Sequence, residues 1–446
     1  MLLIESKKTE CYNKNKYSEY SVRTVYATKI RGFYKRREIM LATLVPLFYE
    51  DMSVASYCLY AQKENMFEKP HMLITGKYDG AGSVVGLEVF ESVSEDDLVA
   101  NCSIIIPINN ISLFSNIEQQ LTGFDGRIIL LIDQSIKPEE SYNKRLLDLK
   151  NKGFKIALKD MPLASVDEFK FMMDDFDLIL INADNGDVVE QAKAFKKLVP
   201  KVDFCAENLH TKEEFDLAKE SGLFKVFEGT FFRVPINKSD TEVAPIKINY
   251  LKIMKLINEP DFDLDQVAQI ITQDPALTIE LLKIANKLTI NSNIRSIAQA
   301  TALLGQKELR RWLNTALLNE LASGKPNEIT RLSLVRARFA ENLAPIFDYA
   351  MRKDELFLMG LFSLLNLILD MPMDKALEQV GVSNEIKNAL ISDDGIFAPQ
   401  LEFLLSYESG DWQEVSRLMI LHDIEMDDVY NAYVEALKWY GSMFIQ

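Results

Sequence analysis

A change in the spacing of hydrophobic residues divides this sequence of 446 residues into two halves. From about residue 100, short runs rich in Ile, Val and Leu alternate with amphipathic stretches of helical length. The runs span 103–108, 127–133, 154–158, 178–182, 202–207 and 225–229. Apolar strands joined by helices are typical of a parallel sheet with helices outside it. At least five such units in succession favour a closed α/β barrel of the TIM type over an open sheet.

The strand pattern stops after residue 236. Residues 237–247 are mostly polar and contain a proline, which is typical of a linker, and helix signals follow one another from residue 248 to 446. Three of these helices have recognisable ends: N-caps at Asp263 and Asp274, the latter before Pro275, and a terminating Gly305. The second half therefore predicts an all-α domain. Residues 1–20 are polar and rich in Lys, Glu and Asn, and predict a loose tail.

Charge and cysteine content exclude several classes of protein. The net charge of −16 argues against sequence-independent binding to nucleic acid, where Lys and Arg supply the affinity. The four cysteines are scattered and contain no CxxC pair, which indicates free thiols in a reducing compartment. The most apolar stretch, 356–369, is too short to span a bilayer and predicts a buried helix. We expect a cytoplasmic protein without a membrane segment.

Polar residues follow the predicted strands at the end where barrels of this type place their chemistry. A two-metal enzyme needs several carboxylates there to hold hard cations and activate water. The sequence offers Asp160, Glu207 and Glu228, but Lys159, Asn182 and Asn208 lie among them. The three histidines share no ligand spacing, so no metal site is expected. Each carboxylate also has a purely structural interpretation, as a turn cap or as part of an ion-pair network.

Residues 206–235, AENLHTKEEFDLAKESGLFKVFEGTFFRVP, carry a resemblance to a known family. They resemble the end of the EAL domain, the cyclic di-GMP phosphodiesterase barrel, in which an AE-K-V-E-T segment precedes a Q-G-Y-F-F turn and a proline. Residues 153–162, GFKIALKDMP, fall on the strand of that family that ends in two aspartates. The resemblance implies an EAL-like barrel over residues 21–236.

The same resemblance implies that the phosphodiesterase site is lost. Lys159 stands where the family has the first of two metal-binding aspartates, and an ammonium works against cation binding there. The name-giving motif is expected in 41–48, which would put Leu44 near its metal-binding glutamate, and 41–48 holds neither acid nor base. The vestigial positions are Leu44, Lys159, Asp160, Asn182, Glu207, Asn208 and Glu228. No catalytic residue and no cofactor are expected.

The helical half resembles the HDOD domain. The markers are DPAL at 274–277, LLKIAN at 281–286 and the helix at 297–305. HDOD domains resemble HD phosphohydrolases without their metal chemistry, and Ser363 and Leu364 occupy the HD position here. The barrel followed by this domain is the arrangement of EAL–HDOD (YuxH-like) bacterial signalling proteins. The resemblance implies a regulator that acts through protein contacts, often with a degenerate barrel.

A cluster of basic residues in the helical half has two interpretations. It could form a surface for an anion or an acidic partner, or belong to ordinary solvated helix faces. The cluster comprises Arg310, Arg311, Trp312, Arg336 and Arg338.

These features predict a non-catalytic signalling regulator that binds other signalling proteins, and neither a membrane nor nucleic acid. The lack of an arginine in 41–48 argues against binding of cyclic di-GMP. Three alternatives stay open: an effector that binds cyclic di-GMP without hydrolysis, a residual phosphodiesterase that uses Asp160, Glu207 and Glu228, and a structural adaptor whose barrel only positions the HDOD helices. A homodimer is also possible, while the partner and the regulated output are not indicated by the sequence.

Overall fold

The protein is described by a computed structural model. The structure describes residues 40–63, 102–121, 126–133, 135–163, 175–233, 245–288 and 294–444. All of these residues belong to one compact unit, Met40–Gln446. The predicted tail at 1–20 and most of the predicted linker at 237–247 lie outside the described residues.

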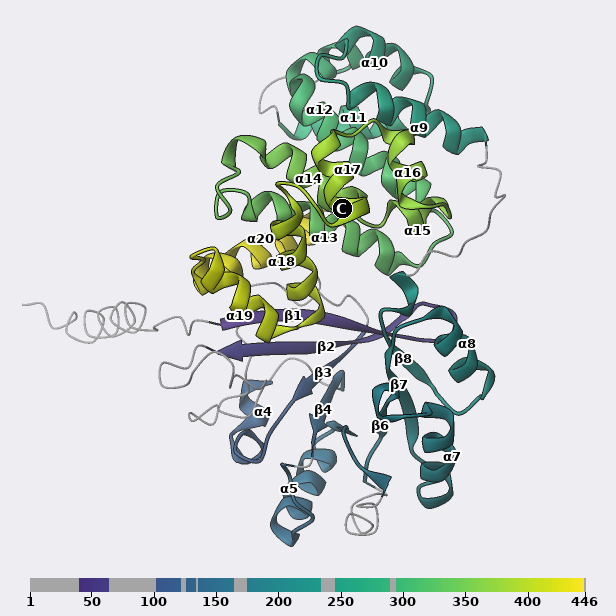
Figure 1. The fold of residues 1–446 in the computed structure, drawn as a ribbon, viewed down its shortest axis with the longest axis vertical. Coiled ribbons are helices and arrows are strands. Elements are labelled where there is room, and N and C mark those ends of the chain that lie inside the picture. Colours follow the sequence, from purple (N-terminus) through teal and green to yellow (C-terminus); the bar gives the residue numbers. More distant parts are fainter. Residues whose placement is uncertain are drawn as a thin grey trace, which may run out of the picture. The chain divides into compact units, whose positions relative to one another are not determined.

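Eight strands form a closed barrel in which each strand pairs with its neighbours in sequence order (Figure 1). This confirms the TIM-type barrel. Strands β2 to β8 run parallel, and β1 is antiparallel to both β2 and β8. The strands are β1 (Met40–Phe48), β2 (Val54–Lys63), β3 (Ser103–Pro107), β4 (Ile128–Ile132), β5 (Lys155–Leu158), β6 (Leu178–Asn182), β7 (Asp203–Leu209) and β8 (Val226–Gly229).

The hairpin of β1 and β2 was not predicted from the sequence. Its turn closes with a bond from the Tyr49 amide to the Ser53 carbonyl, 2.8 Å long, and Met52 adopts a left-handed conformation. Strand β1 pairs with β8 only at Leu47 and Phe48. The other half of β1 therefore has an edge that β8 does not cover.

Helices lie outside the strands, as the alternating pattern predicted (Figure 1). The N-terminal ends of two of them are capped by side chains. Asp187 accepts bonds from the amides of Val189 and Glu190, and Thr211 forms a capping box with Glu214. The helical elements of this half are η2 (Ser112–Phe114), α4 (Ile117–Gln120), α5 (Glu140–Asn151), η4 (Ala183–Asn185), α7 (Val188–Leu198), α8 (Lys212–Glu220) and η5 (Phe231–Arg233). The amphipathic stretch at 165–176, between β5 and β6, lies almost entirely outside the described residues.

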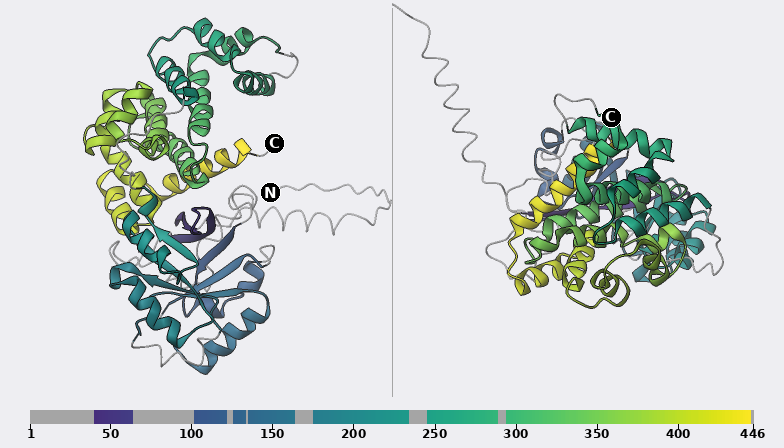
Figure 2. Two further views of the ribbon diagram at one scale, coloured as in Figure 1. Left: turned by 90° about the vertical axis from the view of Figure 1, so that its right-hand side faces the viewer. Right: turned by 90° about the horizontal axis from the view of Figure 1, so that it is seen from above.

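The helices of the second half pack on one another (Figure 2). They are α9 (Pro245–Ile257), α10 (Leu264–Thr272), α11 (Pro275–Lys287), α12 (Ile297–Leu321), α13 (Asn327–Leu343), η6 (Ala350–Arg352), α14 (Lys353–Phe362), α15 (Leu365–Leu369), α16 (Met373–Val380), α17 (Asn384–Ser392), α18 (Ala398–Ser409), α19 (Trp412–Leu421) and α20 (Met426–Phe444). The all-α prediction is confirmed.

The helix ends predicted from the sequence are also found in the structure. Asp263 and Asp274 accept bonds from the amides that follow them, and Gly305, with φ 68° and ψ 172°, breaks the helical conformation inside α12. The apolar stretch 356–369 is largely buried, as predicted, but forms α14 and α15 with a break at Ser363. No helix in the described part of the chain is long and apolar enough to cross a membrane.

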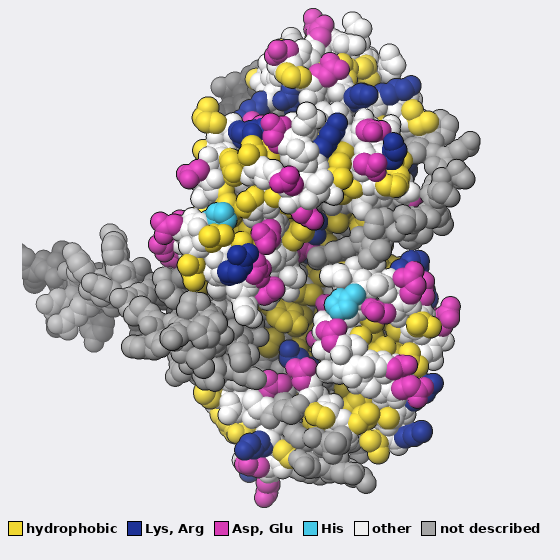
Figure 3. All heavy atoms as spheres, in the orientation of Figure 1, with side chains coloured by type: hydrophobic (Ala, Val, Ile, Leu, Met, Phe, Trp, Pro, Cys, Tyr) yellow, Lys and Arg dark blue, Asp and Glu magenta, His cyan; other side chains and the backbone are white. Residues whose placement is uncertain are grey.

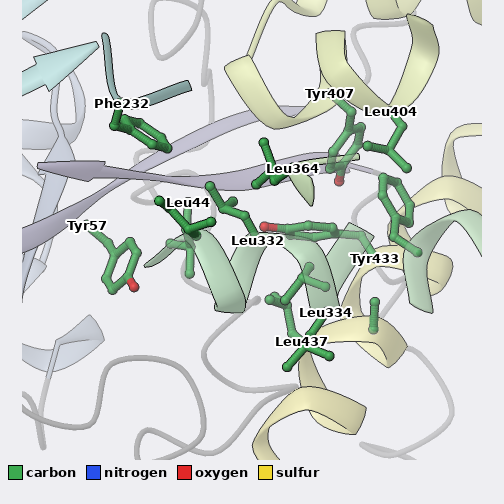
Figure 4. Close-up of a cluster of buried hydrophobic side chains, with 14 of the residues drawn as sticks. Leu44, Tyr57, Phe232, Leu332, Leu334, Leu364, Leu404, Tyr407, Tyr433 and Leu437 are labelled. Atoms are coloured by element: carbon green, nitrogen blue, oxygen red, sulfur yellow. The ribbon is translucent and has the colours of Figure 1, made fainter. Parts of the chain in front are cut away.

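Two hydrophobic clusters stabilise the fold. A small one fills the barrel interior and includes Leu47, Cys58, Ala157 and Cys205. A large one covers the outside of the strands and continues through the helical half. Figure 4 shows part of it, where Leu44 and Tyr57 lie among side chains of the helices. Burial of this apolar surface joins the β1–β2 hairpin to the helices.

Candidate functional site

The carboxyl ends of β5 to β8 bring together most of the residues that the sequence singled out. The strands are parallel, so their last side chains meet at one end of the barrel. We call these residues the rim group: Lys159, Asp160, Asn182, Asp184, Glu207, Asn208, His210 and Glu228.

An irregularity in β7 sets the direction of two rim side chains. The pairing register of β7 with β8 shifts between Ala206 and Leu209, and Asn208 has a φ of 61°. Gly229 of β8 lies so close to the Leu209 backbone that a Cβ atom would overlap it. Bulges of this kind redirect side chains and are frequent next to functional sites.

The amides and acids of the rim bind one another. The Asn208 side-chain nitrogen donates to Asn182 Oδ1 and to Asp184 Oδ2, each at 3.1 Å. The backbone amide of Asn208 donates to Glu228 Oε2 at 2.9 Å, and His210 Nε2 lies 3.0 Å from Asp184 Oδ1. Asn208 is therefore the residue that holds the ends of β6, β7 and β8 together.

Lys159 and Glu207 carry the main electrostatic interaction of the site. Glu207 is 5% exposed, and burial raises the pKa of its carboxyl to about 7, against the opposing effect of Lys159. Burial acts to lower the pKa of Lys159, but Glu207 and Asp160 outweigh it and raise that pKa above its ordinary value. A carboxyl that titrates near neutral pH is suited to proton transfer, and an ammonium beside it can attract a phosphate.

Two residues of β2 have properties that the sequence did not indicate: Cys58, which lies at this site, and Gln62, four residues further along the strand. The Cys58 thiol interacts electrostatically with Lys159 and Glu207, and burial raises its pKa to about 12. Gln62 is 4% exposed, and neither its side-chain nitrogen nor its oxygen has a hydrogen-bond partner among the described residues. Alternate residues of a strand share one face, so period-two spacing could have identified Cys58, Tyr60 and Gln62 as a set.

Leu44 does not belong to the rim group. It lies on β1, in the large cluster outside the barrel, close to Leu332 and Tyr433 of the helices (Figure 4). The register placed on 41–48 is therefore corrected: Leu44 faces the helical half, and it is Cys58 of β2 that interacts with Lys159.

The rim residues do not fit the divalent cations that the EAL family implies. Among the described residues, no three His, Cys, Asp or Glu side chains are placed so that they could hold a metal ion. Lys159 also supplies a positive charge within this acidic group, 3.9 Å from the Asp160 carboxylate. Hard cations require several oxygen ligands in one shell.

The arginines of the predicted basic surface bind groups of their own domain. Arg310 donates to the carbonyls of Ile257 and Glu259, and Arg336, only 4% exposed, pairs with Glu408. Arg311 and Arg338 both pair with Glu341, while Trp312 packs against the large hydrophobic cluster. The face drawn in Figure 3 accordingly shows basic side chains interspersed with acidic ones.

Arg336 also contacts Ser363, one of the two residues at the HD position of the helical half. Its guanidinium donates to Ser363 Oγ at 3.0 Å while it pairs with Glu408. His422 lies elsewhere, against the ring of Phe347.

Comparison with known proteins identifies the domains. A model of the HDOD domain matches residues 244–391. The cyclic di-GMP phosphodiesterase CdgJ of Vibrio cholerae is 26% identical over 359 residues, which cover 79% of this chain and 82% of CdgJ. YuxH of Bacillus subtilis is 24% identical over 408 residues, 88% of this chain and 96% of YuxH. The solved EAL domain of Mycobacterium smegmatis DcpA is 15% identical, covers 43% of this chain and 90% of that one, and has a TM-score of 0.32.

The similarity to CdgJ corrects one expectation. The missing family residues predicted that the chain has no enzymatic activity, and that prediction is contradicted by a relative over most of the chain that is a cyclic di-GMP phosphodiesterase. It also supports a relation to cyclic di-GMP signalling. An eight-stranded barrel is followed by a match to the HDOD domain, and the relatives extend over both halves, so the chain combines a closed barrel with an HDOD domain.

Proposed function

We propose that the chain is a regulator in cyclic di-GMP signalling, that its rim group binds the dinucleotide, and that its HDOD domain passes the signal to other proteins. The observation that carries this proposal is the Lys159 ammonium, which is held at the carboxyl end of the barrel with 23% of its side chain exposed. CdgJ, a phosphodiesterase for this dinucleotide, is a relative over both domains.

The chemistry of the rim group suits the two parts of such a ligand. A phosphodiester needs a cation, which Lys159 supplies. A guanine edge presents N–H donors, and the carboxylates can accept from these. The unpartnered amide of Gln62 adds a donor and an acceptor, since a buried polar group without a protein partner marks a place for water or a ligand.

The lack of an arginine in 41–48 does not weigh against binding at the rim, because the Leu44 side chain from that segment faces the helices. The cation at the rim is Lys159, which directly follows β5.

Titration calorimetry with cyclic di-GMP tests the binding. We expect a dissociation constant of about 10 µM or tighter, and a weakening of about tenfold or more in Lys159→Gln, because a charge-assisted bond is lost. Lys155→Gln is the matched control, since Lys155 lies exposed at the opposite end of the same strand. No heat at several hundred micromolar, or equal affinity in both variants, would refute the proposal.

Chromatography of the same samples with Mg²⁺ or Mn²⁺ measures turnover. A linear dinucleotide product would extend the function from binding to hydrolysis.

Co-purification from native cells tests the proposed contact with other proteins. A specific partner should be retained by the full chain and lost when the dinucleotide is depleted. A partner retained equally in both conditions would contradict signal transfer.

A further inference from the structure

Tyr60 lies between the rim group and the helical half. It is on β2, opposite Thr43 of β1, and its side chain is partly buried. On one side, the Lys159 ammonium lies 5.9 Å from the centre of the Tyr60 ring. A cation over an aromatic face is attracted by the quadrupole of the ring, so this contact restrains the position of Lys159.

The turn between α18 and α19 packs against the same residue. Gly410 ends α18 with a φ of 71°. A Cβ atom at Gly410 would lie 3.4 Å from both Cβ and Cγ of Tyr60, which shows how closely the turn approaches β2. The backbone of the turn is thus within van der Waals reach of Tyr60, and it is the left-handed conformation that favours glycine at this position.

Tyr407 and Trp412 restrain the turn between α18 and α19 on both sides. Tyr407, one turn before Gly410, exchanges bonds between its hydroxyl and the backbone of Ala42. Trp412, directly after the turn, is 3% exposed, and its ring lies 5.4 Å from that of Tyr407. A displacement of Tyr60 would therefore disturb the close packing at the end of α18.

We propose that Tyr60 is a positioning residue that holds Lys159 in place and couples the rim group to the α18–α19 turn. Its ring contacts the cation on one side, and the helix end packs against the same side chain. A ligand that draws Lys159 toward itself would change this packing and so reach the HDOD half. The ligand-dependent part of this inference rests on the proposed function.

A double-mutant cycle in the ligand-free protein tests the coupling. Lys159→Gln should change the amide hydrogen exchange of residues 410–412 by about threefold or more, and should change it little further in a Tyr60→Leu background. Tyr60→Phe retains the ring, so in that background the effect of Lys159→Gln should return. Lys155→Gln serves as the control and should leave the turn unchanged.

Trp412 offers a second readout in the folded protein. In a version with Trp312→Phe and Trp439→Phe, the Trp412 emission should shift with Lys159→Gln only where an aromatic ring is present at position 60. The coupling would be refuted if Lys159→Gln and Tyr60→Leu had additive effects on the amide exchange of residues 410–412. It would also be refuted if Lys159→Gln left that exchange unchanged. If cyclic di-GMP does not bind, the proposed function is refuted. The double-mutant cycle in the ligand-free protein would still decide whether Tyr60 couples Lys159 to the turn.

Discussion

At the scale of single residues, Glu207 is the group whose chemistry depends most on its surroundings. An exposed glutamate is ionised at neutral pH, but this one is buried beside both a lysine and further acids. Burial favours the neutral form, so the folded protein binds this proton more tightly than the unfolded chain does. The sequence identified Glu207 as a rim residue but could not give its pKa, which depends on how deeply the barrel encloses it.

Glu207 should make the protein less stable as the pH rises. Between pH 4.5, its ordinary pKa, and about 7, the folded state keeps a proton that the unfolded chain releases. The free energy of unfolding should therefore fall across this window, by up to about 3 kcal/mol, and stay level above it. Urea denaturation at a series of pH values measures this.

Glu207→Gln should remove this contribution. The variant should match the wild type at pH 4.5 and be more stable at pH 8, because glutamine has no proton to lose. Glu213→Gln, at an exposed site on α8, should keep the wild-type profile. Parallel profiles for wild type and Glu207→Gln would show that Glu207 titrates normally.

At the scale of elements, the β7–β8 pair shows how a local irregularity builds a site. The register shift in β7 and the left-handed Asn208 let its side chain reach Asn182 and Asp184 while its amide binds Glu228. The strands themselves were predicted from their hydrophobic runs. The bulge was not, because it arises from the pairing of two segments and not from either one alone.

Gly229→Ala should be strongly destabilising, since a Cβ atom would overlap the Leu209 backbone and φ is 144°. We expect a loss of more than about 3 kcal/mol in the free energy of unfolding, which is at the high end for a single substitution. Gly222→Ala is the matched control: it also has a positive φ, but its Cβ would meet nothing within 4 Å. It should cost about 1 kcal/mol. Similar losses in both variants would mean that backbone strain alone, and not the approach of Leu209, requires glycine.

At the scale of the whole molecule, the helical half completes the barrel. The half of β1 that β8 leaves uncovered is satisfied by Tyr407 of α18, whose hydroxyl donates to the Ala42 carbonyl at 2.8 Å and accepts from its amide at 3.3 Å. Further along the hairpin, Tyr57 donates to Glu328, which pairs with the buried Arg331. Unpaired strand edges favour aggregation, so this contact protects the barrel as well as joining the halves.

Tyr407→Phe should lower the free energy of unfolding by about 1 to 3 kcal/mol, because it leaves the buried amide and carbonyl of Ala42 without this partner. Tyr349→Phe is the control, since that hydroxyl binds the Ile396 carbonyl in a more exposed position and its loss should cost less. Chemical denaturation followed by circular dichroism gives both values. An equal cost for the two variants would contradict a special role for the contact with β1.

The sequence by itself determined the two halves, the order of strands and helices from residue 103 onward, and most of the rim group. These follow from hydrophobic spacing, caps and strand ends, which are local properties of the chain. The tertiary structure decided which residues face one another. It turned Leu44 toward the helices, brought Cys58 and Tyr60 to the Lys159 side, and bound the arginines of the basic cluster within their own domain. Strand pairing and burial set these contacts, and both depend on segments far apart in the sequence.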